Sequence, residues 1–164
     1  MTSKIALIIS AIVALPFLMI LFSFLKNDLP WTDPPGIGQR LSTYLNTNIA
    51  ETTVDSVFPE LIPRRYALDM EVLKQLIVGA VTQLGWDIEQ DFDQEHILKT
   101  VVTTPLLGFK DDVVIKLQQG AGDTVVASIR SESRTGKGDL GTNTKHVIDL
   151  FTTLDSNIAS AARQ

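Results

Sequence analysis

The residues best suited to chemistry lie in one run of the chain, residues 130–146. The run combines three glycines with several basic side chains, and a helix-like pattern begins at its end. Backbone amides that precede a helix bind anions well, and nearby positive charge strengthens that preference. The run therefore fits an anion or carboxylate site. The binding candidates are Arg130, Arg134, Gly136, Lys137, Gly138, Asp139, Gly141 and Asn143, joined by Lys145 and His146 at the helix start and by Asp111 and Asp112 from the strand before.

A structural interpretation of the same run is favoured over the binding one. The glycines then form a tight turn, Asp139 caps the helix, and Asn143 bonds the loop backbone. The arginines pair with Asp111, Asp112 and Glu132. Ion-pair networks of this kind often resemble functional sites.

Nucleotide binding does not fit this run. Residues 136–141 match G-x-G-x-x-G, but a dinucleotide site requires a second parallel strand after the helix. The helix after residue 141 is the last predicted element, so no such strand follows it. A phosphate-binding P-loop requires Gly-Lys-Ser/Thr after four spacer residues, which is also missing. We expect neither a nucleotide nor any other cofactor.

A nucleophilic hydrolase is a remote alternative. Ser131 or Ser133, with His146 and Asp111 or Asp112, has the residue types of a triad. No Gly-x-Ser-x-Gly elbow is present, and the serines lie within a predicted strand. The two aspartates face opposite sides of that strand, which argues against a shared metal. The chain has no cysteine. We therefore predict no catalytic residue and no metal site.

The N-terminal segment predicts a retained membrane anchor. Residues 5–25 are 21 residues without a charge, flanked by Lys4 and Lys26. A helix of that length spans about 31 Å, enough to cross a hydrocarbon core. No small-x-small cleavage site follows it. Two positive charges precede the span and Lys26 follows it, which favours a cytoplasmic N-terminus. The predicted location is the bacterial inner membrane, with a periplasmic C-terminal domain.

The rest of the chain is acidic. Residues 27–164 carry 12 Lys and Arg against 19 Asp and Glu, a net charge of −7. Nucleic-acid binding requires a basic surface, so it is not expected. The same charge argues against a domain that lies flat on anionic lipid.

Hydrophobic periodicity predicts three parts: an anchor over 1–26, a linker with a short amphipathic helix over 27–58, and a globular domain over 59–164. The short helix, at 37–49, either packs on the domain, as we expect, or lies along the membrane surface. In the domain, an edge strand is predicted at 64–68, a helix capped by Asp69 and ended by Gly85, and a last helix from Val147 onward. Four further strands are predicted at 86–91, 96–104, 111–118 and 124–133. This order, β-α-β-β-β-β-α, implies an α+β fold: an antiparallel sheet of four to five strands with helices on one face.

Two strands of this sheet predict a specific hairpin. If residues 124–133 fold back on 111–118 around Ala121, paired positions sum to about 242. Val113, Ile115, Leu117, Val125, Ala127 and Ile129 then share the core face. On the other face Asp112 lies opposite Arg130, and Lys110 opposite Glu132.

The connection between the two central strands, residues 105–109, is an apolar hairpin tip. It contains Leu106, Leu107 and Phe109. Such a tip folds over the edge of the core or, if exposed, contacts a partner protein or lipid.

Two motifs carry a family resemblance: residues 106–112, Leu-Leu-Gly-Phe-Lys-Asp-Asp, and Arg130-Ser-x-Ser-Arg-x-Gly-x-Gly-Asp-x-Gly-x-Asn143. With Phe58-Pro-Glu-Leu-Ile-Pro-Arg-Arg-Tyr66, they resemble the membrane-anchored proteobacterial branch of domain-of-unknown-function family 1499, over roughly residues 34–155. Lys145 and His146 replace the usual Arg-Ile, and the family's Asn-Cys pattern is missing. The resemblance implies a bacterial envelope protein and supplies no activity.

These observations favour a non-enzymatic, membrane-tethered envelope protein that acts as a binding or accessory subunit of a membrane protein complex. The second hypothesis is a domain that binds a small anionic ligand or lipid headgroup through the loop from Arg130 to Asn143.

Overall fold

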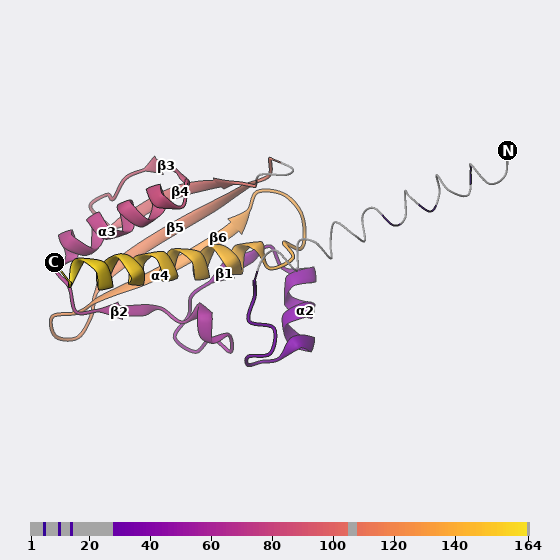
Figure 1. The fold of residues 1–164 in the computed structure, drawn as a ribbon, viewed down its shortest axis with the longest axis horizontal. Coiled ribbons are helices and arrows are strands. Elements are labelled where there is room, and N and C mark those ends of the chain that lie inside the picture. The colour runs from indigo at the N-terminus through magenta and orange to yellow at the C-terminus, as the bar shows by residue number, and fades with distance from the viewer. Residues whose placement is uncertain (1–4, 6–9, 11–13, 15–27, 105–107, 164) are drawn as a thin grey trace.

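The computed structural model describes residues 28–104 and 108–163, together with Ile5, Ser10 and Ala14. Three α-helices, one 3-10 helix and six strands are assigned within these residues (Figure 1). In chain order they are α2 (Ile37–Asn46), β1 (Ile49–Glu51), η1 (Pro59–Leu61), β2 (Arg64–Tyr66), α3 (Met70–Gln83), β3 (Asp87–Gln90), β4 (Ile97–Thr103), β5 (Lys110–Gln119), β6 (Val125–Ser133) and α4 (Thr142–Ala161).

The strands form one antiparallel sheet in the order β1-β6-β5-β4-β3, and β2 also pairs with β6. β1 pairs with residues 130–132 of β6, and β2 pairs with residues 125–127, so both occupy the same edge. The α+β class predicted from the sequence is therefore confirmed. The predicted number of four to five strands is wrong, because the three-residue β1 adds a sixth.

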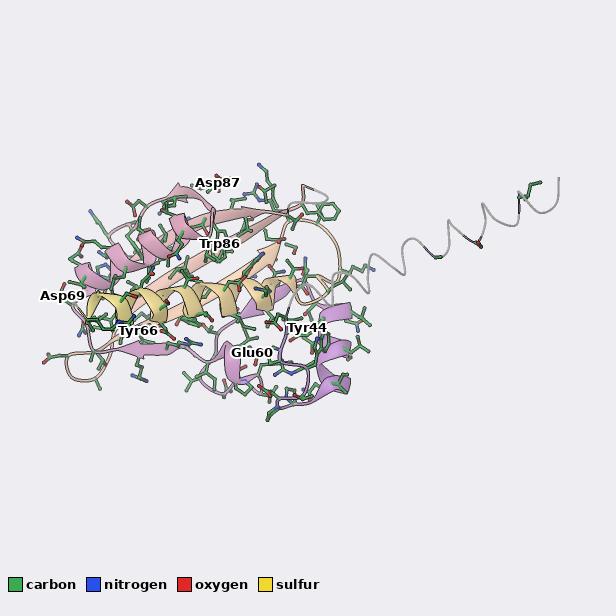
Figure 2. All side chains as sticks on the ribbon, viewed as in Figure 1. Tyr44, Glu60, Tyr66, Asp69, Trp86 and Asp87 are labelled. Atoms are coloured by element: carbon green, nitrogen blue, oxygen red, sulfur yellow. The ribbon has the colours of Figure 1, made fainter. Side chains whose placement is uncertain are left out.

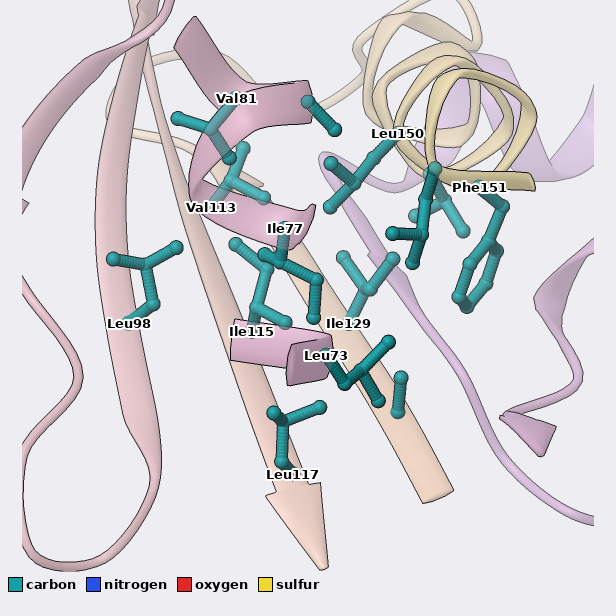
Figure 3. Close-up of a cluster of buried hydrophobic side chains, with 14 of the residues drawn as sticks. Leu73, Ile77, Val81, Leu98, Val113, Ile115, Leu117, Ile129, Leu150 and Phe151 are labelled. Carbon is teal, nitrogen blue, oxygen red and sulfur yellow. The ribbon is translucent and has the colours of Figure 1, made fainter. Parts of the chain in front are cut away.

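Two helices cover one face of the sheet, and their apolar sides form the core with it (Figure 1). α3 begins at Asp69, whose side chain accepts from the amides of Glu71 and Val72 as predicted. It ends before Gly85, where φ is +72°. Figure 3 shows Leu73 and Ile77 of α3, and Leu150 of α4, directed toward the side chains of the central strands, with Phe151 of α4 beside them. All four of these side chains are buried.

The register of the β5–β6 hairpin differs from the predicted one. Asp112 pairs with Glu132 and Val114 with Arg130, so paired positions sum to 244 and the turn is centred on Gly122. The shift moves every partner by two residues, which preserves the alternation of faces. The predicted core positions are therefore confirmed as buried. The predicted Asp112–Arg130 and Lys110–Glu132 pairings are wrong, because Glu132 lies opposite Asp112. The backbone carbonyl of Lys110 instead accepts from the backbone amide of Arg134.

The segment before residue 59 belongs to the same sheet and core as the residues after it. β1 supplies the buried Ala50, and Thr52 exchanges hydrogen bonds with the backbone of Ile129. α2 buries Arg40 and Tyr44 against the domain, which agrees with the packed position expected for this helix. α2 lies at the end of the molecule opposite the C-terminus of α4 (Figure 1).

The predicted membrane span over residues 5–25 lies outside the described residues, apart from Ile5, Ser10 and Ala14. Within the part of the chain that is described, no helix has the length and apolar character needed to cross a bilayer.

Candidate functional site

The ion pairs of Arg134 lie on the sheet face opposite α3 and α4. Arg134, just after β6, donates to both carboxylate oxygens of Asp112 at 2.6–3.0 Å and to Glu89 at 3.2 Å. All three side chains are 39–56% exposed. The two carboxylates raise the pKa of Arg134, so its guanidinium stays positively charged. Asp112 and Glu89 balance that charge.

Arg130 forms a second group of ion pairs on the same face. Its guanidinium donates to Glu132 at 2.5 Å and lies 3.6 Å from Glu51 of β1. Both arginines of the run are therefore paired with carboxylates, as the structural interpretation expects, although Asp111 is not one of the partners. Exposed pairs like these contribute little to stability, typically below about 1 kcal/mol each.

The glycine loop is occupied by a carboxyl group that the chain itself supplies. The carboxylate of Asp139 accepts from the amide of Gly141 at 2.9 Å and from the amide of Asn143 at 2.8 Å. These amides lie at the start of α4, where an external anion would bind. Asp139 therefore caps α4 as the structural interpretation expects, and these contacts do not favour the anion-site hypothesis.

The glycines of the loop allow it to pack directly on α2. A Cβ at Gly138 would collide with the carbonyl oxygen of Leu45 and lie 3.1 Å from that of Tyr44. The amides of Asp139 and Leu140 donate to the carbonyls of Thr47 and Tyr44, which lie at the C-terminal end of α2. The loop thus satisfies carbonyls that a helix end leaves without partners. At Gly141, φ is +82° and a Cβ would collide with Leu29.

A buried polar network links β6 to the first turns of α4. Ser131 donates to Oδ1 of Asn143 at 2.6 Å, and its Oγ lies 3.1 Å from Nδ1 of His146. Because the Ser131 proton is donated to Asn143, Nδ1 of His146 must carry the proton of the second bond. The amide of Asn143 donates to the carbonyl of Asn48 and to Ser133. Ser131 and Asn143 are fully buried.

The serine–histidine contact does not have the geometry of a hydrolase site. A nucleophilic serine gives its proton to histidine and is open to substrate, whereas Ser131 accepts from His146 and is 0% exposed. In the described part of the chain, no cluster of three or more His, Asp or Glu side chains is arranged to hold a metal.

Asp111 is a further member of this network, and its carboxyl group is buried. It is 2% exposed, and its Oδ2 has no hydrogen-bond partner and lies 3.9 Å from Nε2 of His146. Burial raises the pKa of Asp111 above its ordinary value, and a hydrogen bond from the Ser133 side chain partly opposes this. Burial lowers the pKa of His146 to about 4, and Lys145 adds to the effect. The pair therefore favours its uncharged forms.

Sequence reasoning missed a second buried polar cluster, centred on Arg40 of α2. Arg40 is 0% exposed and forms an ion pair with Glu60 of η1. It also donates to the hydroxyl of Tyr44 at 3.0 Å and to the carbonyls of Asp33 and Pro34 at 3.2 and 2.6 Å. Figure 2 shows Tyr44 and Glu60 at the end of the molecule where α2 lies. The only sign of this cluster in the sequence is the amphipathic spacing of residues 37–49. The burial of Arg40 was not expected, because an arginine in such a helix is normally solvated.

The predicted hairpin tip is described only in part. Leu106 and Leu107 lie outside the described residues. Phe109 is 51% exposed, and its backbone amide and carbonyl both bond to Thr104. In the described part of this tip, Phe109 is therefore exposed and does not fold over the edge of the core.

Together, these features define an α+β domain in which a glycine-rich loop fastens an N-terminal helix to the start of the last helix. A family model described as "Protein of unknown function (DUF1499)" matches residues 31–154. The chain therefore belongs to the DUF1499 family, as its motifs suggested. A comparison with curated proteins found no match.

Proposed function

We propose that this protein is a non-enzymatic, membrane-tethered envelope protein that acts as a binding or accessory subunit of a membrane protein complex. In this proposal residues 5–25 span the bacterial inner membrane once, and the domain lies on the periplasmic side. The apolar length of residues 5–25 between Lys4 and Lys26 supports the tether.

One observation carries the accessory role: the groups suited to chemistry are bonded to one another. Arg134 is held by Asp112, Asp139 caps α4, and Ser131 is enclosed with Asn143 and His146. What the domain presents outward includes apolar side chains such as Phe109. Exposed apolar groups of this kind are typical of contact surfaces.

Purification from native membranes in mild detergent tests the proposal. We expect the full chain to elute with at least one stoichiometric membrane protein. Phe109→Ser should weaken this association and leave the thermal stability of the domain unchanged. Val72→Ser is the matched control, because Val72 is 45% exposed near the start of α3, toward the opposite end of the molecule. A solitary monomer in every mild detergent would contradict the proposal.

A further inference from the structure

One flank of α2 carries an apolar stripe that the domain does not cover. Ile37, Leu41 and Leu45 are 65%, 40% and 47% exposed. They recur every four residues, so at about 100° per residue they fall within an arc of about 80°. An amphipathic helix of a globular protein normally turns such a stripe toward the core. In α2 the core side is instead occupied by Arg40 and Tyr44.

The contacts of Arg40 fix α2 in this orientation. Its guanidinium is bonded to Glu60, to Tyr44 and to the carbonyls of Asp33 and Pro34. Rolling the helix to bury the stripe would break these bonds and leave a buried charge without a partner, which is strongly unfavourable. At the C-terminal end, the amides of Leu140 and Asp139 donate to the carbonyls of Tyr44 and Thr47, and Gly138 packs on the backbone of Leu45. The outward position of the stripe is therefore built into the fold.

The position of α2 relative to the apolar segment suggests what covers the stripe. Leu29 is buried and, like Tyr44 of α2, packs on Gly141. Leu29 comes three positions after Lys26, which flanks the apolar segment. Three residues reach at most about 11 Å. A span at residues 5–25 would therefore hold α2 close to the bilayer surface.

The charge around α2 fits the same surface. Residues 37–46 contain no acidic residue, and their one basic residue, Arg40, is buried and paired. Lys137 is exposed. It lies beside the C-terminal end of α2, because the carbonyl of Gly136 accepts from the side chain of Asn48 and Gly138 packs on Leu45. A lysine at that position suits lipid phosphates. The helix itself thus carries no charge that anionic lipid repels, and the exposed carboxylates of Asp28 and Asp33 precede it in the chain.

We infer that α2 lies in the headgroup region of the bilayer, with Ile37, Leu41 and Leu45 inserted toward the acyl chains. The inference rests on the proposed tether at residues 5–25. Interfacial helices bind through buried apolar area, and a tether adds a high local concentration. The helix thereby sets the orientation of the whole domain on the membrane.

Fluorescence quenching in the full-length protein tests this arrangement. The chain has no cysteine, so single labelling sites are available by substitution. Leu41→Cys carries a probe on the stripe. Gln39→Cys is the matched control, since residue 39 is also exposed on α2 but lies about 160° from residue 41. Leu15→Cys reports on the tether. Each variant is reconstituted into vesicles of phosphatidylcholine and phosphatidylglycerol that contain nitroxide-labelled lipid.

We expect shallow nitroxides to quench the Leu41→Cys probe several-fold more than the Gln39→Cys probe, and deep nitroxides to quench the Leu15→Cys probe. Quenching at residue 15 with equal quenching at residues 39 and 41 would overturn the α2 inference and leave the tether standing. Absence of quenching at residue 15 would overturn the tether and, with it, the inference. A concentration-dependent blue shift at residue 41 without lipid quenching would overturn the inference in favour of self-association.

Discussion

Gly138 lies so close to Leu45 that a Cβ at position 138 would stand 2.6 Å from the carbonyl carbon of Leu45. The clash is with backbone, so no side-chain rotation relieves it. This contact explains the glycine at position 138 of the run from Arg130 to His146. The loop packs against α2, and the absence of a side chain at Gly138 permits that close approach.

The first prediction follows from this contact. Gly138→Ala should lower the free energy of unfolding by about 1–3 kcal/mol, the usual cost of overpacking. Gly38→Ala is the matched control, because a Cβ at Gly38 meets nothing within 4 Å and the position lies within α2. That change should raise stability by up to about 1 kcal/mol through helix propensity. Chemical denaturation of both variants measures the difference, and equal effects would refute the packing role.

The buried Arg40–Glu60 pair supports a double-mutant cycle. Arg40→Met or Glu60→Gln alone should destabilise the domain by about 3–5 kcal/mol, because each leaves a buried charge without its partner. The double variant should lose much less than the sum of the two. Urea unfolding of all four proteins gives the coupling energy, and strict additivity would show that the two side chains do not act as a pair.

The ion pairs of Arg134 predict a much smaller effect. Arg134→Ala should leave the free energy of unfolding nearly unchanged, since its side chain and those of Asp112 and Glu89 are all substantially exposed. Phosphate or sulfate should not raise the melting temperature of the wild-type protein, because Asp139 already occupies the amides at the start of α4. A thermal shift with either anion that Arg134→Ala abolishes would instead support the ligand-binding hypothesis.

Local patterns in the sequence predicted most elements of the fold, with the exceptions of β1 and η1, and the faces of the hairpin. Asp69 and Gly85 mark the ends of α3 because a cap and a positive φ are properties of a few neighbouring residues. The alternation of Val113, Ile115 and Leu117 fixes which side of β5 faces the core. It does not fix the register, because a shift of two residues preserves both faces.

Features that depend on distant partners were not predictable in the same way. Arg130 on β6 and Arg134 just after it suit Asp112 equally from the sequence, and the turn around Gly122 selects Arg134. β1 has only three residues, and it pairs with residues 130–132 of β6, some 80 positions later in the chain. The role of Arg40 depends on Glu60, which no local pattern connects to it. Within the run from Arg130 to Asn143, Asp139 caps α4 and both arginines pair with carboxylates, which are contacts that the structural interpretation predicts.

The buried carboxyl group of Asp111, whose Oδ2 has no hydrogen-bond partner, predicts a stabilising substitution. Burial raises its pKa, so its folded form resists ionisation. For such a group the favourable contribution is complete at low pH and is lost as pH rises from the ordinary value through the raised one. Asp111→Asn removes this penalty and offers an amide donor to Nε2 of His146. We expect a gain of about 1 kcal/mol at pH 7 that vanishes near pH 3. Lower stability at pH 7 would mean that the carboxylate is ionised and compensated.

His146 should make the domain sensitive to acid in the opposite sense. Its pKa falls from 6.5 to about 4 on burial, so the unfolded chain binds a proton that the folded chain excludes. Stability is therefore retained above pH 6.5 and lost as pH falls toward 4, by up to about 3 kcal/mol. Asp111 titrates with the opposite sign, so the effect is best measured in the Asp111→Asn background. Adding His146→Gln to that background should flatten stability between pH 6.5 and 4, and an unchanged slope would assign the acid sensitivity to other groups.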